Sequence, residues 1–189
     1  MKALAAVVLL CGFVFGQAQT GDNSHLAIRP GAQDANEQHI AKEVRHELLM
    51  LPYYSIFDDL EFSVSGNNVT LLGAVVNPVL KKDAEGAVKR IEGVSSVNNQ
   101  IKVLSLSPMD DRIRREEARA ISNEGGLYRY FMGAVGSIHI IVDNGHVTLK
   151  GVVDNPSDDT MAKMAANQVP GVFSVTDDLQ IGNQTSAKK

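Results

Sequence analysis

Hydrophobic and polar residues alternate along two stretches of the chain, and each stretch is expected to form a β-hairpin. In the first, Leu60, Phe62 and Val64 alternate with polar residues. A turn at Gly66–Asn68 follows, and Val69–Val76 is the return strand. Alternation with a period of two residues is typical of a strand with one buried face.

The second hairpin is predicted from the same pattern further along the chain. Its strands are 138–142 and 147–153, and Asn144-Gly145 lies between them. Asn-Gly between alternating apolar residues is a strong signal for a tight hairpin turn, because both residues tolerate a positive φ.

Apolar residues at helical spacing predict four helices. Ile40, Val44 and Leu48 lie on one face of the first helix. Asn-Pro pairs favour helix starts, and glycine favours the position after a helix end. The predicted helices are 36–50, one from Asn77-Pro78 to Gly93, 110–121, and one from Asn155-Pro156 to Pro170-Gly171. A last strand closes each half, at 97–103 and at 174–181.

The two halves are copies of one unit. Residues 69–103 align without gaps on residues 147–181, with 13 identities in 35 positions, whereas average residue usage predicts roughly two. The predicted order is therefore α-β-β-α-β, twice. Only Ser105–Pro108 separates the copies, so we expect the units to touch.

The repeated motifs resemble those of the BON domain. The residues that carry the resemblance are Val69–Val75 with Gly93–Val97 and, in the second copy, Gly145–Gly151 with Gly171–Val175. Two copies behind a signal peptide are similar to the osmotically inducible periplasmic protein family of bacteria.

The resemblance implies an α+β fold: two tandem α-β-β-α-β units, each a three-stranded mixed sheet with two helices packed on it. It also implies an envelope location and a role in binding phospholipid surfaces or envelope partners. The motif glycines are expected to be structural: Gly73, Gly93, Gly145, Gly151 and Gly171. We expect Gly73 and Gly151 to permit close approach of a helix to the sheet.

The N-terminal residues have the pattern of a signal peptide. Lys2 precedes the apolar stretch Ala3–Phe15, and Gly16 and Ala18 place small side chains before a cut after Ala18. An uncleaved anchor and lipidation at Cys11 are the alternatives. We expect a periplasmic or secreted protein. The expected organisation is a signal peptide at 1–18, a flexible segment at 19–35, a first domain at 36–104, a linker at 105–109, a second domain at 110–182 and a disordered tail at 183–189.

Composition narrows the functional classes. The chain of 189 residues has a net charge of −4 and one cysteine. An acidic chain argues against general nucleic-acid binding, and one cysteine excludes a disulfide scaffold. If the signal peptide is removed, 17 basic and 22 acidic residues leave a charge of −5 and no thiol.

No catalytic constellation is apparent. His139 and His146 are expected on the surface by strand alternation, and the pair His39 and His46 is too widely spaced to hold a metal without a third ligand. The acidic pairs at 58–59, 158–159 and 177–178 do not match a calcium loop, so we expect solvated or capping carboxylates. We therefore predict no enzyme activity, no cofactor, no metal and no small-molecule substrate; the oligomeric state stays open.

Aromatic residues gather in one connection of each unit. Of the eight that would remain after cleavage, six lie between the first helix and the first strand of a unit: Tyr53, Tyr54, Phe57, Tyr128, Tyr130 and Phe131. One interpretation is a lid over a small core. The other is an exposed loop at a bilayer interface, where Arg129 beside the rings would meet phosphate.

Arginines gather on the helix at 110–121. Arg112, Arg114, Arg115 and Arg119 lie there, interleaved with Glu116 and Glu117. An ordinary salt-bridged surface is one interpretation. Attraction to anionic lipid is the other, since a basic residue near such a surface contributes roughly 1 kcal/mol.

These observations lead to two functional hypotheses. The first is a non-enzymatic exported protein that binds anionic phospholipid or envelope proteins and supports envelope integrity under stress. Its lipid-binding residues would be Arg112, Arg115, Arg119, Tyr128, Arg129, Tyr130 and Phe131. The alternative is a periplasmic protein-interaction or chaperone-like module without lipid binding, in which exposed sheet edges pair with a partner strand.

Overall fold

The structure is a computed structural model that describes residues 35–133 and 135–182. The expected signal peptide, the segment before residue 35 and the tail from residue 183 lie outside the described residues.

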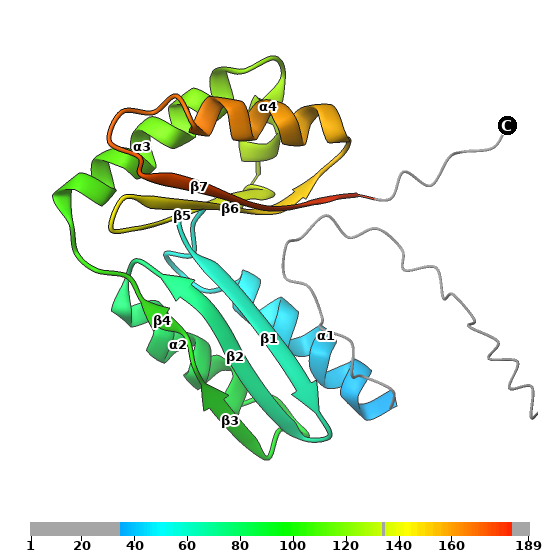
Figure 1. The fold of residues 1–189 in the computed structure, drawn as a ribbon. Helices are drawn as coiled ribbons and strands as arrows, with labels where there is room; N and C mark the ends of the chain where they lie inside the picture. The colour runs from blue at the N-terminus through cyan, green and yellow to red at the C-terminus, as the bar shows by residue number, and fades with distance from the viewer. Residues whose placement is uncertain (1–34, 134, 183–189) are drawn as a thin grey trace, which may run out of the picture.

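The chain forms two α-β units in tandem, as predicted (Figure 1). The first consists of α1 (Ala35–Leu49), β1 (Asp59–Ser65), β2 (Asn68–Val75), α2 (Pro78–Lys89), β3 (Ser96–Asn99) and β4 (Lys102–Val103). The second consists of α3 (Pro108–Asn123), the 3-10 helix η1 (Leu127–Phe131), β5 (Ile138–Asp143), β6 (His146–Val153), α4 (Pro156–Ala166) and β7 (Ser174–Ile181).

Each unit has a mixed sheet with the hairpin on one side and the last strand on the other. β1 pairs antiparallel with β2, and β3 and β4 run parallel to β2 in one continuous register. The second sheet has the order β5-β6-β7, antiparallel and then parallel. The single strand predicted at 97–103 is thus two short strands, and the Asn99 side chain accepts a hydrogen bond from the Ile101 backbone at the break.

Local signals fix the ends of the elements. The Asn77 side chain accepts a hydrogen bond from the Val79 backbone at the start of α2, and Asn155 does the same for Ser157 at the start of α4. Gly145 has a φ of +78° and its neighbour Asn144 a φ of +53°, the geometry that a tight hairpin turn requires.

Gly73 and Gly151 have a different role from the one expected. They do not accommodate a helix. A Cβ at Gly151 would lie 1.9 Å from the carbonyl oxygen of Ser137, and a Cβ at Gly73 would lie 2.2 Å from that of Asp59. Both glycines have a positive φ, so each permits close contact between the backbones of neighbouring strands.

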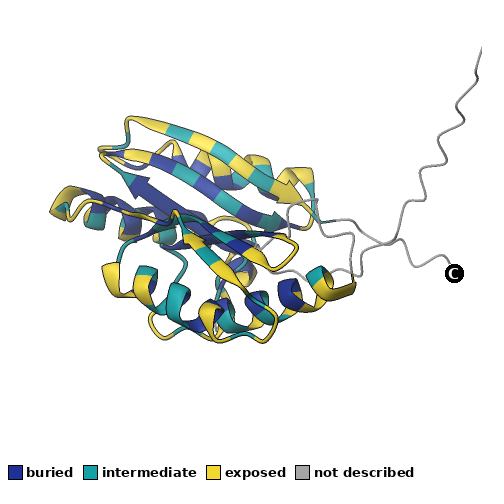
Figure 2. Ribbon diagram, turned by 90° about the horizontal axis from the view of Figure 1, so that it is seen from below, coloured by how far each residue is buried: buried dark blue, intermediate teal, exposed yellow. Residues whose placement is uncertain are grey.

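Two hydrophobic cores lie between the sheets and their helices, and Figure 2 shows the buried inner positions of the strands. Each unit also contributes one residue to the other's core. Phe57 of the first unit packs against the second core, and Val135 of the second packs against the first. The expectation that the units touch is confirmed.

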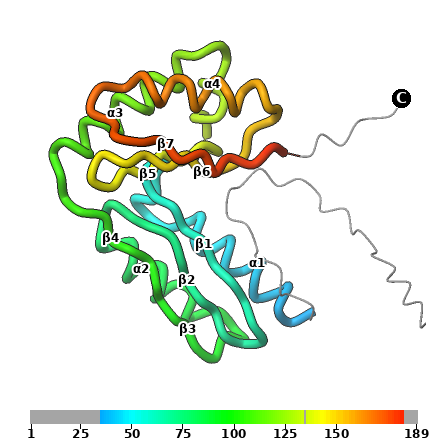
Figure 3. Tube along the Cα trace, viewed as in Figure 1, coloured from blue at the N-terminus to red at the C-terminus, as the bar shows by residue number. Residues whose placement is uncertain are grey.

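The face of the second sheet that is turned away from α3 and α4 rests on the first unit (Figure 3). The backbone N–H of Ile140 donates to the carbonyl oxygen of Ile56 at 2.7 Å. The Lys150 ammonium donates to Asp59 at 2.7 Å and to Glu61 at 2.6 Å. We call this set of contacts the joint.

Two expectations about polar residues near the joint are wrong. His139 points away from its own helices, but it is fully buried; its Nδ1 lies 2.6 Å from the Asp58 carbonyl oxygen and its ring stacks on Tyr54. Asp58 and Asp59 are buried, not solvated. Asp58 accepts hydrogen bonds from Ser55 and from the Val76 backbone, and burial raises the pKa of its carboxyl.

Among the helices that the structure describes, none combines the length and the apolar character needed to cross a bilayer.

Candidate functional site

The outer side of α3 presents three arginines. Arg112, Arg115 and Arg119 are exposed, and we call them the α3 arginine face. Arg112 makes one long ion pair, with 3.9 Å between its Nε and a carboxylate oxygen of Glu116. Arg115 and Arg119 make no ion pair with any residue that the structure describes. The interpretation of an ordinary salt-bridged surface therefore fits Arg112 only loosely and the other two not at all.

Arg114 does not belong to this face. It is buried, its Nη1 donates to Asp111 at 2.6 Å and its Nη2 donates to the Val142 carbonyl oxygen at 2.6 Å. It anchors α3 to β5, so that the exposed arginines are carried by a fixed helix.

A second anchor holds the start of α3. The buried Asp110 carboxylate accepts hydrogen bonds from the backbone N–H groups of Asn144, at 3.0 Å, and Gly145, at 2.9 Å. Ser107 caps the helix through its hydroxyl oxygen. The turn of the second hairpin is therefore bound to the first turn of α3.

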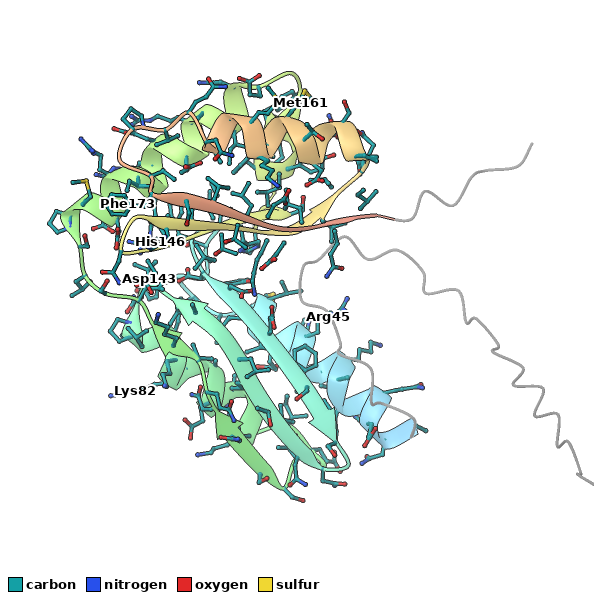
Figure 4. The ribbon with its side chains drawn as sticks, in the orientation of Figure 1. Arg45, Lys82, Asp143, His146, Met161 and Phe173 are labelled. Atoms are coloured by element: carbon teal, nitrogen blue, oxygen red, sulfur yellow. The ribbon has the colours of Figure 1, made fainter. Side chains whose placement is uncertain are left out.

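Apolar side chains project at this end of α3. Phe173 is 77% exposed and Leu106, just before α3, is 86% exposed. Met109, in the first turn of α3, is exposed as well. Figure 4 shows Phe173 near His146, with which it makes a tilted ring contact at 5.9 Å. The Sδ of Met109 lies 3.4 Å from Nη2 of Arg112. We call Leu106, Met109 and Phe173 the apolar tip.

The sequence interpretation missed the apolar tip. Phe173 aligns with Ser95 of the first copy, so the repeat itself contained the signal: a large aromatic residue at a position that is polar in the other unit.

The opposite end of α3 also carries exposed apolar groups. Tyr128 in η1 is 60% exposed and Met132 directly after η1 is 67% exposed. The α3 helix has 16 residues, so it spans about 24 Å. The α3 arginine face therefore lies between two apolar groups, one at each end of the helix.

Three residues predicted to bind lipid are instead used by the scaffold. Tyr130 is buried, and its hydroxyl donates to Asp158 and accepts from the Asp154 backbone. Burial, together with the bond to Asp158, raises the pKa of Tyr130 to about 12. Arg129 forms ion pairs with Asp154 and Asp158. Phe131 is half-buried and packs against the second core.

The aromatic residues of the two connections are thus divided between a lid over the core and an exposed loop. Tyr54 and Tyr130 are buried and cover core, whereas Tyr53 and Tyr128 are exposed. Asp158, expected to be solvated or capping, is buried in the Tyr130 network.

Glu117 lies on the inner side of α3, between Ile113 and Ile121. Its side chain is fully buried, and neither carboxyl oxygen has a hydrogen-bond partner. Burial raises the pKa of this carboxyl from 4.5 to about 8. Glu117 is therefore largely uncharged at neutral pH, and Arg112, Arg115 and Arg119 give the helix a net positive outer surface on an acidic protein.

Within residues 35–133 and 135–182, no group of three or more metal-ligating side chains is placed to hold an ion.

The BON domain family model matches this sequence twice, at residues 36–105 and 110–183. The chain belongs to the BON domain family. BON domains are associated with membrane and phospholipid binding and with envelope proteins, and they are in general not enzymes.

Comparison with solved structures adds little to the BON assignment. The C-terminal domain of CdsD, a structural protein of the type III secretion system of Chlamydia trachomatis, is 12% identical with a TM-score of 0.30, over 74% of this chain and 96% of that one. A second structure of CdsD is 12% identical with a TM-score of 0.28, over 75% of this chain and 91% of that one. Values this low carry no argument about function. No curated protein matches the sequence.

Proposed function

We propose that this BON protein binds anionic membrane surfaces peripherally through the outer side of α3. The observation that carries the proposal is the α3 arginine face with the apolar tip at one end and Tyr128 with Met132 at the other. Arginine side chains suit lipid phosphates, and exposed apolar side chains can enter the bilayer interface.

The charge distribution supports this orientation. The chain carries −4 overall, so its surface as a whole is repelled by anionic lipid. Arg112, Arg115 and Arg119 oppose that repulsion on the outer side of α3, and each contributes roughly 1 kcal/mol when it lies near an anionic surface. Binding is therefore expected to be weak to moderate, salt-sensitive and oriented.

Flotation with vesicles tests the proposal. The protein is expected to float with vesicles of phosphatidylglycerol and phosphatidylcholine at low salt, and much less at high salt or with phosphatidylcholine alone. The variant Arg112→Glu, Arg115→Glu, Arg119→Glu should lose binding by on the order of 100-fold or more, because three attractive charges become repulsive.

A matched control changes the same amount of charge elsewhere. Lys42, Lys82 and Arg90 are exposed on the helices of the first unit (Figure 4 labels Lys82). Their reversal to Glu should reduce binding much less than reversal of the α3 arginine face. Equal losses in the two triple variants, or no flotation at low salt, would reject an oriented site on α3.

Export belongs to the same proposal. The pattern at residues 1–18 supports cleavage after Ala18 and an envelope location, where a role under osmotic or other envelope stress would act. Mass spectrometry of the protein from its native envelope fraction should give an N-terminus at Gln19. An intact Met1 in the exported protein would contradict it.

The chaperone-like alternative has one observation in its favour. β7 is an eight-residue strand at the edge of the second sheet, and among the described residues it pairs only with β6. Such an edge can accept a partner strand, although Asp177 and Asp178 on β7 discourage indiscriminate pairing. Suppression of client aggregation by the charge-reversed α3 variant, without vesicle binding, would favour this alternative.

A further inference from the structure

A groove beside the joint shares Arg115 with the α3 arginine face, but the membrane-binding proposal uses none of its other lining residues. It has a volume of about 400 Å³, which lies within the range of ligand sites, and it lies between units, where such sites are common. Three segments line it: the connection between α1 and β1, the connection between β2 and α2, and the start of α3. We call it the joint groove.

Its apolar wall comes from the first unit. Tyr53, Phe57 and Val76 line this wall. Phe57 is held in place because it also packs against the second core. The wall therefore consists of two aromatic rings and an aliphatic side chain, and one of the rings is held by packing against a core.

Tyr53 itself has no structural explanation. It is 75% exposed, and its backbone has a φ of +69°, in the left-handed region that costs a non-glycine residue about 1–2 kcal/mol. Strain of this kind is more frequent at ligand sites than elsewhere. A residue that neither fills the core nor relaxes its backbone is a candidate for contact with a ligand.

The exposed charge along the joint groove favours an anion. Asp111 is paired with Arg114, and Asp58 is buried, with both carboxylate oxygens accepting hydrogen bonds, from Ser55 and from the Val76 backbone. Arg115 remains as the cation without an ion pair among the described residues. The charge of Arg114 is offset by Asp111, although the buried Nε of Arg114 has no hydrogen-bond acceptor.

We propose that the joint groove binds one single-chain anionic amphiphile, with the phosphate at Arg115 and the start of the acyl chain against Tyr53, Phe57 and Val76. The combination of one unpaired guanidinium with an apolar wall identifies the chemical class. The volume of the groove is sufficient for one acyl chain. The amphiphile binds as a monomer, so binding here needs no bilayer, although Arg115 also belongs to the α3 arginine face.

Calorimetry on the full chain tests the proposal with lauroyl-lysophosphatidylglycerol below its micelle concentration. Saturable binding is expected, and the zwitterionic lauroyl-lysophosphatidylcholine should bind at least about tenfold more weakly, because it offers Arg115 no net charge. Arg115→Gln should weaken binding of the anionic probe by about tenfold, whereas Arg90→Gln should leave it unchanged.

Tyr53→Gly separates ligand contact from folding. Glycine relieves the left-handed backbone, so the variant should be at least as stable as the wild type in urea. Its affinity for the anionic probe should nevertheless fall by about fivefold or more, because the ring is lost. Phe173→Ser, at the apolar tip, should retain the wild-type affinity.

Several results would overturn the joint groove as the site. These are no saturable binding, equal affinity for the two probes, or undiminished binding by Tyr53→Gly and Arg115→Gln. Amide NMR shifts centred on Tyr128 or Phe173, in place of Tyr53 and Asn77, would also overturn it. Vesicle flotation by Tyr53→Gly should persist, so failure of this site and failure of the membrane-binding proposal are distinguishable.

Discussion

A single residue, Glu117, determines much of the behaviour of α3. It occupies the inward position that Val44 has in α1, yet it is a carboxyl with no partner in a closed core. Its helical position could be predicted from the sequence, because the spacing of Ile113 and Ile121 assigns it to the apolar face. Its protonation could not be predicted, since that depends on how completely the second unit closes over it.

Glu117 predicts a pH dependence of stability. The pKa of Glu117 is about 8 in the folded protein and 4.5 in the unfolded chain. The protonated side chain therefore contributes fully to the stability of the fold below pH 4.5, and this contribution is lost as the pH rises to about 8. Over this window the folded protein retains a proton that the unfolded chain releases, and the free energy of unfolding falls by up to about 1.4 kcal/mol per pH unit. Urea denaturation at several pH values should show this slope, and Glu117→Gln should remove it.

Glu116 provides the control for that measurement. It is the preceding residue on α3 and is only half-buried. Glu116→Gln should keep the wild-type slope, and an unchanged slope in Glu117→Gln would refute the assignment to Glu117.

The close strand approach at Gly151 gives a second prediction for a single residue. Gly151→Ala places a Cβ 1.9 Å from a backbone oxygen at a φ of +120°, so neighbouring strands must separate. We expect a loss of more than about 3 kcal/mol in the free energy of unfolding. At Gly66 the φ is +58° and nothing lies within 4 Å, so Gly66→Ala should cost only about 1 kcal/mol. Similar losses at both sites would be inconsistent with this account.

At the scale of elements, local patterns predicted the helices and hairpins well. The first helix was expected at 36–50 and is found at Ala35–Leu49, because caps and apolar spacing are local. The connections were less predictable. η1 at Leu127–Phe131 was not foreseen, since the burial of Tyr130 depends on Asp158 on a distant helix. Contact with Asp158 also explains why Tyr130 and Arg129 belong to the scaffold, and Phe131 joins them by packing against the second core.

The ion pairs of the joint provide a prediction at this scale. Lys150 is about a quarter exposed, whereas Asp59 is nearly fully buried. Burial alone would lower the pKa of Lys150, but its hydrogen bonds to Asp59 and Glu61 outweigh that effect and raise it. Lys150→Met should lower the free energy of unfolding by about 2 kcal/mol, because it leaves a buried carboxylate without its cation. The loss is smaller than the ~3–5 kcal/mol for a fully buried pair, because Lys150 is partly exposed.

A double-mutant cycle measures whether that loss belongs to the pair. In an Asp59→Asn, Glu61→Gln background, Lys150→Met should cost under about 0.5 kcal/mol in the free energy of unfolding. Strict additivity would show that Lys150 does not couple the two units.

At the scale of the whole molecule, the sequence predicted that the two units touch but not which surfaces they use. The alternation along the strand correctly assigned His139 to the face of the sheet opposite the helices. The sequence of one unit does not indicate that the other unit covers this face and buries His139. The exchange of Phe57 and Val135 between cores and the joint contacts make the two units one packed body. The α3 arginine face is consequently held in a fixed orientation relative to the first unit.

This packing predicts a single cooperative unfolding transition. Because each core contains a residue of the other unit, unfolding of one unit should destabilise the other. Calorimetry of the wild type should give equal calorimetric and van't Hoff enthalpies. Two separate transitions would show that the units fold independently and that the joint contributes little.

The central claim is that the outer side of α3 meets the membrane. Paramagnetic relaxation enhancement from spin-labelled lipid in phosphatidylglycerol-containing nanodiscs tests it most directly, because the effect falls steeply with distance from the bilayer. The account predicts strong broadening of amide signals at Arg112, Arg119, Tyr128 and Phe173, with α1 and α2 unaffected. Broadening centred on α1 or on the far end of β7 at residues 179–181, or no broadening at low salt, would contradict it.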